Sequence, residues 1–274
     1  ERETVTARIL SIKPFVGVGL ISYSAYLWHQ PIFAFARIRH AEEVPDWAMM
    51  LLAGLALVLA WASWRFIEQP FRGKAPLVLP SEGFAEAVRA EWEAVDEQID
   101  PTRMPFTRTA NAAIDKVAHQ HAEVADMLAD YGDSDLLCYR AESPQELVER
   151  EAAVWGPYLD WAAETLGARL EPRQGLMHQP QDAEAIARLR APVHAMSDFE
   201  LAAFHDLVSL TGSLVLGFAA THRARDPEEI WQASRVDELW QEELWGEDEE
   251  ATALAKRKRD AFLHACRFHS LARS

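Results

Sequence analysis

The chain has 274 residues, of which 49% are hydrophobic and 26% are charged, and its formal net charge is −16 at pH 7. The charge is unevenly distributed, since residues 1–74 carry a formal +2 and residues 75–274 a formal −18. A surface this acidic repels phosphate groups, which excludes nucleic acid as a partner. The two cysteines, Cys138 and Cys266, are far apart and form neither a disulfide framework nor a metal-ligand pair.

Two apolar stretches dominate the first region. Residues 15–36 and 47–64 contain no Asp, Glu, Lys or Arg, and each is close to the roughly 20 residues that a membrane-spanning helix needs. They predict a transmembrane hairpin that contacts the membrane through residues 15–64. Six basic residues flank the hairpin and two lie in its turn, so both ends are expected on the cytoplasmic side. The alternative is a pair of buried helices in a soluble core.

The hairpin also carries a family resemblance. The segments GLISYSAYLWHQPIF at 19–33 and WASWRFIEQPFR at 61–72 resemble the last two membrane helices of integral-membrane O-acyltransferases of the acyltransferase-3 type. In that family the catalytic histidine and its arginine-bearing partner motif lie in early helices, which this chain lacks. The resemblance therefore implies no enzymatic activity and no catalytic residue here, and His29 is interpreted as a packed histidine.

Apolar spacing and start signals predict helices through the second region. After a short extended segment at 75–80, Ser81 is positioned to cap a helix. A second helix spans about 110–128, and Gly132 is expected to end it in a left-handed conformation. The apolar face of the first helix is expected to consist of Phe84, Val88, Trp92 and Val95.

Further start signals follow along the chain. Ser143 and Glu146 form a capping-box pattern that predicts a helix running to Gly167. Residues 168–180 are expected to be irregular or weakly extended, and a weaker helix is expected near 181–195. A second capping box, at Ser197 and Glu200, opens a helix that continues through the apolar run 207–220. We interpret that run as the buried centre of a bundle; a third membrane span is the alternative, but the run is short for one.

The last part of the chain combines tryptophan with acidic residues. Asp226 begins a helix expected to end at Trp245, and a charged helix follows from about 248 to 270. Exposed aromatic side chains beside carboxylates are typical of protein-binding surfaces, although Trp240 and Trp245 could equally fill the core. The predicted partner-binding residues are Asp237, Glu238, Trp240, Gln241 and Trp245.

Motifs for enzymes and cofactors are missing from the second region. It has no glycine-rich phosphate loop, no GxSxG and no HExxH. His264, Cys266 and His269 are close in sequence, but their spacing points them in different directions on a helix. The sequence therefore predicts no cofactor and no metal site.

Five motifs in the second region carry another resemblance. They are RMPFTRTANAAID at 103–115, SDLLCYRAE at 134–142, WGPYLDWA at 155–162, LTGSLVLGFA at 210–219 and VDELWQEELWG at 236–246. In this order and spacing they resemble the assembly chaperone of the F-type ATP synthase that holds the free alpha subunit of the catalytic sector. The resemblance implies a protein that binds and shields its client without a cofactor. It also implies a β-rich N-terminal domain, of which only APLVLP at 75–80 is recognisable.

The expected architecture is mainly α, with a transmembrane hairpin at 1–74 followed by an all-α chaperone domain at 75–274. The expected function is ATP synthase assembly through binding of the alpha subunit. The alternatives are a terminal fragment of a membrane O-acyltransferase and a non-functional fusion of the two. The hairpin is expected in the inner (cytoplasmic) membrane with the acidic domain in the cytoplasm; that domain alone suits the cytoplasm or the mitochondrial matrix.

Overall fold

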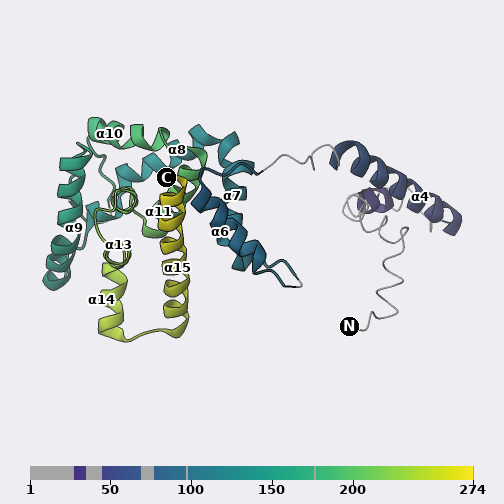
Figure 1. Cartoon of the computed structure of the whole chain (residues 1–274). Helices are drawn as coiled ribbons and strands as arrows, with labels where there is room; N and C mark the ends of the chain where they lie inside the picture. The colour runs from purple at the N-terminus through teal and green to yellow at the C-terminus, as the bar shows by residue number, and fades with distance from the viewer. Residues whose placement is uncertain (1–27, 35–44, 69–76, 97, 176, 274) are drawn as a thin grey trace. The chain divides into compact units, whose positions relative to one another are not determined.

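The computed structural model describes residues 28–34, 45–68, 77–96, 98–175 and 177–273 (Figure 1). The chain divides into two compact units, Glu1–Leu77 and Val78–Ser274. Each unit is described by itself below.

The described part of the first unit centres on one long apolar helix. Helix α4 (Asp46–Ser63) continues into a π-helical turn at Trp64–Glu68. Its segment Trp47–Phe66 has 20 residues with a mean hydropathy of 1.8 and is little buried, so it is long and apolar enough to cross a membrane. A helical turn at 28–34 contacts it, since the Trp28 Nε1–H donates to Ser63 Oγ at 2.7 Å.

The predicted hairpin is matched in one of its two helices only. Within the described residues, Trp47–Phe66 is the one helix that could span a membrane by length and composition. The other predicted span, 15–36, is described only at 28–34 and otherwise lies outside the described residues.

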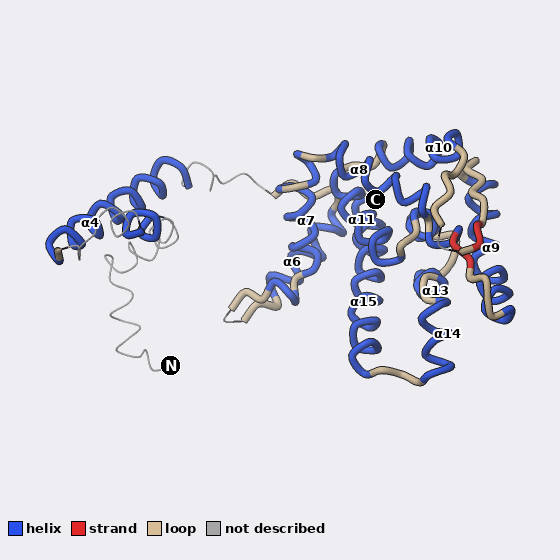
Figure 2. Tube along the Cα trace, turned by 180° about the vertical axis from the view of Figure 1, so that it is seen from behind, coloured by secondary structure: helices blue, strands red, loops and turns tan. Residues whose placement is uncertain are grey.

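The second unit is mainly helical, and its helices are visible in Figure 1 and, from behind, in Figure 2. It departs from the predicted all-α domain in having one pair of short strands among its described residues. Two short strands pair in parallel, β1 (Tyr139–Arg140) with β2 (Arg173–Gln174). Short 3-10 turns lie at Pro101–Arg103, Val117–His119, Tyr131–Ser134 and Leu136–Cys138. The α-helices are α6 (Glu82–Glu93), α7 (Pro105–Asp115), α8 (His121–Asp130), α9 (Gln145–Thr165), α10 (Ala183–His194), α11 (Asp198–Thr211), α12 (Leu214–Thr221), α13 (Pro227–Ala233), α14 (Val236–Trp245) and α15 (Glu249–Ala272).

Helix α11 forms the centre of the second unit. It packs against α7, α8, α12 and α15, and half of its 14 residues are buried. The predicted buried centre is therefore confirmed, but the single long helix is wrong. Gly212 has a φ of +69°, which ends α11, and the Ser213 hydroxyl then caps α12 by accepting from the Leu216 N–H at 3.0 Å.

A second predicted helix is also divided. The chain leaves the α conformation after Asp115, passes through a 3-10 turn and starts α8 at His121. Gly132 lies in a 3-10 turn, without the left-handed conformation expected of it. Its role is close packing, because a Cβ there would meet side chains of Leu214, Ile186 and Leu189 at 3.2–3.3 Å.

The predicted helix starts have mixed outcomes. The Ser81 cap is present, and so is the capping box of Ser197 and Glu200. The prediction of a capping box at Ser143 is wrong, because α9 starts at Gln145 and Pro144, not Ser143, is at the cap position. Trp92, expected on an apolar face, is 48% exposed. The predicted helix from Asp226 is likewise divided, into α13 and α14.

Candidate protein-binding site

Helices α14 and α15 form a hairpin that extends from the rest of the second unit. In Figures 1 and 2 the two helices extend in the same direction and are joined at their far end by a short loop. Gly246, with a φ of +87°, follows the last residue of α14 and permits the turn. The Asp248 carboxylate accepts from the Ala251 N–H at 2.8 Å and so caps α15.

The tip of this hairpin exposes large apolar side chains. Trp245 is 83% exposed, Leu244 57% and Leu254 45%. Residues 236–250 contain eight acidic and no basic residues, so the apolar tip has an acidic rim. A large exposed tryptophan gains hydrophobic free energy only when a partner covers it. The alternative that Trp245 fills the core is therefore excluded, and the tip has the composition of a protein-binding surface.

The structure separates the five predicted partner-binding residues into two groups. Glu238, Gln241 and Trp245 are exposed, and their spacing of three and then four residues places them on one face of α14. Asp237 and Trp240 are half-buried on the side of the helix that meets α9. Only the first group is available to a partner without movement of α14.

Arg150 of α9 holds α14 in place. Its guanidinium carbon lies 5.1 Å from the centroid of the Trp240 ring, a cation–π contact. The same guanidinium donates two hydrogen bonds of 2.9 Å to the Glu243 carboxylate. This pairing lowers the pKa of Glu243 and raises that of Arg150. Trp240 therefore serves the attachment of α14 to α9.

Asp237 belongs to a buried charged cluster that the sequence did not predict. Glu151 of α9 is 1% exposed, accepts from the Ala141 N–H at 2.8 Å and interacts electrostatically with Asp237. Burial, and then Asp237, raise the pKa of Glu151 to about 7, against the lowering effects of the Ala141 N–H and of Arg140.

Arg140 supplies the positive charge of the cluster. It is 9% exposed, and its guanidinium carbon lies 4.9 Å from the centroid of the buried Trp155 ring. Trp155 in turn donates from Nε1 to the carbonyl oxygen of Ala233, at the end of α13, at 2.6 Å. Among the described residues, Arg140 Nε and Nη1 and Asp237 Oδ1 are buried without a hydrogen-bond partner. Glu151 has a sequence signal: it lies four residues from both Leu147 and Trp155, so it sits on the apolar face of α9.

The described residues bring together no group of three or more His, Cys, Asp or Glu side chains that could hold a metal ion. His269 is 3% exposed, and burial lowers its pKa to about 4. Cys138 and Cys266 are free thiols, and burial raises the pKa of each to about 12. Such thiols are protonated at neutral pH and are poor nucleophiles.

Comparisons with known proteins decide the family. The family model for the ATP12 chaperone protein matches residues 65–163. The crystal structure of Atp12 from Paracoccus denitrificans is 48% identical, with a TM-score of 0.71, over 73% of this chain and 86% of that one. The chain belongs to the ATP12 chaperone family. The crystal structure of the Atu1473 protein of Agrobacterium tumefaciens is 40% identical with a TM-score of 0.68, over 72% of this chain and 74% of that one.

A second similarity concerns a different class of protein. The O-acetyltransferase OatA of Staphylococcus aureus is 39% identical over 69 residues, which are 25% of this chain. The chain spans only 11% of the length of that enzyme. The ATP12 match, in contrast, covers most of the solved Atp12 structure. The chain is therefore a member of the ATP12 family that also contains an acyltransferase-like segment.

Proposed function

We propose that this protein is an assembly chaperone that binds and shields the free alpha subunit of the F-type ATP synthase. Membership of the ATP12 chaperone family supports the chaperone role. The five motifs between 103 and 246 that resemble the ATP synthase assembly chaperone support the choice of client. One observation supports a binding mode: the tip of the α14–α15 hairpin is exposed, with Trp245 83% exposed.

The physical basis of the proposed role is temporary burial of apolar surface. A subunit that has not met its neighbour exposes an apolar interface, which makes it prone to aggregate. The tip offers Trp245, Leu244 and Leu254 to such an interface, and the acidic rim attracts basic or neutral surfaces at long range. Because acidic rim residues act mainly on the rate of association, the complex can remain reversible.

The experiment is a binding titration of purified alpha subunit with the full chain and with its Trp245→Ala variant. Loss of a central aromatic anchor costs about 2 kcal/mol or more, so we expect the dissociation constant to rise by roughly 30-fold or more. Trp92→Ala is the matched control, because Trp92 is a 48% exposed tryptophan on α6, a helix that is not part of the hairpin. Both variants should keep the circular dichroism spectrum of the parent.

Two outcomes contradict the proposed binding mode. One is a Trp245→Ala variant that binds alpha subunit as tightly as the parent; the other is an equal loss in the Trp92→Ala variant. If the parent chain itself does not bind alpha subunit, the proposed choice of client is wrong. The exposed Glu238 offers an electrostatic test: Glu238→Lys should slow association and change its salt dependence, with little effect on dissociation.

We also propose that α4 attaches the chaperone to a membrane, with the acidic unit on the cytoplasmic side. The observation is the 20-residue apolar segment Trp47–Phe66, of which little is buried. The chain produced in a bacterium should remain in the membrane fraction after a carbonate wash, and protease added outside the cytoplasm should spare the acidic unit. Recovery of the full chain without detergent as a soluble protein would show that α4 does not anchor it.

A further inference from the structure

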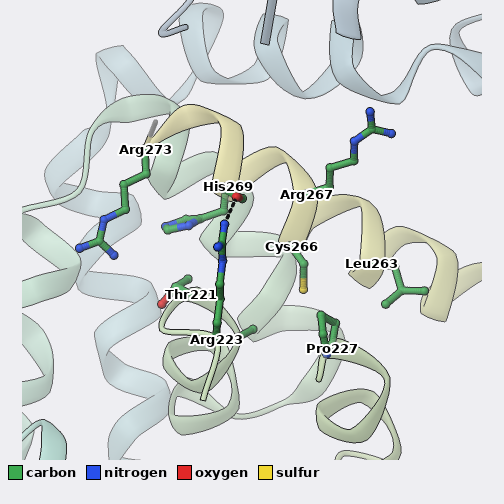
Figure 3. Close-up of a pocket in the computed structure, with 10 residues that line it drawn as sticks. Thr221, Arg223, Pro227, Leu263, Cys266, Arg267, His269 and Arg273 are labelled. Atoms are coloured by element: carbon green, nitrogen blue, oxygen red, sulfur yellow. Dashed lines mark hydrogen bonds between the residues drawn. The ribbon is translucent and has the colours of Figure 1, made fainter. Parts of the chain in front are cut away.

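A pocket of about 570 Å³ lies between the C-terminal half of α15 and the segment that joins α12 to α13 (Figure 3). This volume is within the range of small-molecule sites. Three of the ten residues that line the pocket are arginines and none is acidic. That composition is unexpected in a region with a formal charge of −18. The lining residues are Ala220, Thr221, Arg223, Pro227, Leu263, Cys266, Arg267, His269, Ser270 and Arg273.

Arg223 is held in an uncommon backbone conformation at one wall of the pocket. Its φ is +52°, in the left-handed region that non-glycine residues rarely occupy. Such strain concentrates at functional sites. From this position its guanidinium crosses to α15 and donates to Ser270 Oγ at 2.5 Å, as Figure 3 shows.

His269 and Arg273 form the neighbouring part of the wall. In Figure 3 the imidazole of His269 lies between the side chains of Arg223 and Arg273. His269 is 3% exposed, and among the described residues its Nε2 has no hydrogen-bond partner. Burial is the main cause of the lowered pKa of His269; Glu200 raises this pKa, and the charges of Arg273 and His222 lower it further. Glu200 is engaged by the backbone N–H and hydroxyl of Ser197 in the capping box.

The third arginine of the lining, Arg267, contacts an aromatic ring instead. The Arg267 guanidinium carbon lies 5.4 Å from the centroid of the Phe106 ring, and in Figure 3 the side chain points away from Arg223 and Arg273. Two guanidiniums, from Arg223 and Arg273, therefore remain for a ligand. No carboxylate among the described residues forms an ion pair with either of them. Ala220, Pro227, Leu263 and Cys266 form the apolar part of the lining.

We propose that this pocket binds a small molecule with an oxyanion head, a phosphate or a carboxylate, on a compact apolar body. Arg223 and Arg273 would hold the head, since guanidinium groups bind oxyanions through paired N–H donors. The body would lie on Leu263 and Pro227. The site lies on the α12–α15 side of the unit and does not depend on the client proposed for the hairpin tip.

The test is isothermal titration of the full chain with phenyl phosphate, benzoate and inorganic phosphate in a phosphate-free buffer of physiological ionic strength. We expect saturable 1:1 binding of one aromatic anion, at least tenfold tighter than inorganic phosphate, because only the aromatic probes use the apolar wall. Whichever aromatic anion binds more tightly identifies the head as phosphate or carboxylate.

Variants separate the pocket from general charge effects. Arg273→Gln should weaken binding of the preferred aromatic anion by tenfold or more; Arg273 is exposed, so the variant should fold. Arg257→Gln removes the same charge from an exposed position of α15 outside the pocket and should leave binding unchanged. The proposal is overturned if neither aromatic anion binds saturably, or if Arg257→Gln weakens binding as much as Arg273→Gln does.

Discussion

Replacement of Glu151 by glutamine tests the buried charged cluster that holds the start of α14. Burial is the main reason why the pKa of Glu151 rises from 4.5 to about 7 in the folded chain. In the unfolded chain the carboxyl ionises near its ordinary pKa, so its contribution to stability is complete below about pH 4.5 and is lost as the pH rises through about 7. Each pKa unit corresponds to about 1.4 kcal/mol, which makes the loss at pH 8 on the order of 3 kcal/mol.

The glutamine variant should not show this loss. Its side-chain oxygen can still accept from the Ala141 N–H, as Glu151 does at 2.8 Å, and Arg140 retains Asp237 as a charge partner. At pH 5 we expect the variant and the parent to differ by less than about 1 kcal/mol. At pH 8 the variant should be more stable by about 1–3 kcal/mol. Urea unfolding of the full chain, followed by far-ultraviolet circular dichroism at both pH values, measures the difference.

The control is Glu149→Gln, which makes the same charge change at an exposed position of α9 and should leave the pH dependence unaltered. His269 acts in the opposite sense: its pKa is lowered from 6.5 to about 4, so its contribution is present above about pH 6.5 and is lost as the pH falls through 4. The contribution of His269 to the free energy of unfolding is the same in the parent and the variant, so it cancels when the two are compared. If both lose the same stability between pH 5 and pH 8, titration of Glu151 does not control it and the reasoning fails.

Two further predictions concern glycines at the centre of the bundle, each checked by thermal unfolding followed by circular dichroism. Gly217→Ala should destabilise the chain by about 1–3 kcal/mol, because the new Cβ would lie 2.8 Å from Val208 Cγ2 and 3.2 Å from the Phe204 ring; a variant that melts with the parent would show that the neighbours move freely. Gly212→Ala should cost about 1–2 kcal/mol through the φ of +69°, and Gly212→Asn less, since asparagine tolerates that region. Equal losses for alanine and asparagine at Gly212 would point to a steric cause instead.

The helix starts that could be predicted from the sequence depend on neighbouring residues. The Ser81 cap and the Ser197–Glu200 capping box involve contacts across three residues, and such short-range contacts leave a pattern that local reasoning detects. The Ser143 pattern failed although it looked equally strong, because the actual start lies at Gln145, after Pro144. A capping pattern thus predicts that a helix begins nearby, with an uncertainty of one or two residues.

The helix breaks were missed for a different physical reason. Residues 207–220 are apolar on nearly every side, so no change of periodicity marks the point where α11 ends. The break needs only Gly212 in a left-handed conformation and Ser213 as the next cap. The run can bend there because neighbours bury both halves, and that tertiary contact is invisible in a local pattern.

The outcome for the predicted site shows what determines a binding face. The sequence presents Trp240 and Trp245 in the same acidic helix, and only residues nearly a hundred positions away distinguish them: Arg150 engages Trp240 and Glu243, and Glu151 engages Asp237. These contacts fix one side of α14 to α9. The opposite face, with Glu238, Gln241 and Trp245, is therefore presented in a fixed orientation. Binding through a fixed face avoids part of the entropy cost of ordering side chains and backbone, so a weaker attachment of α14 to α9 should reduce client affinity even when every residue of the exposed face is unchanged.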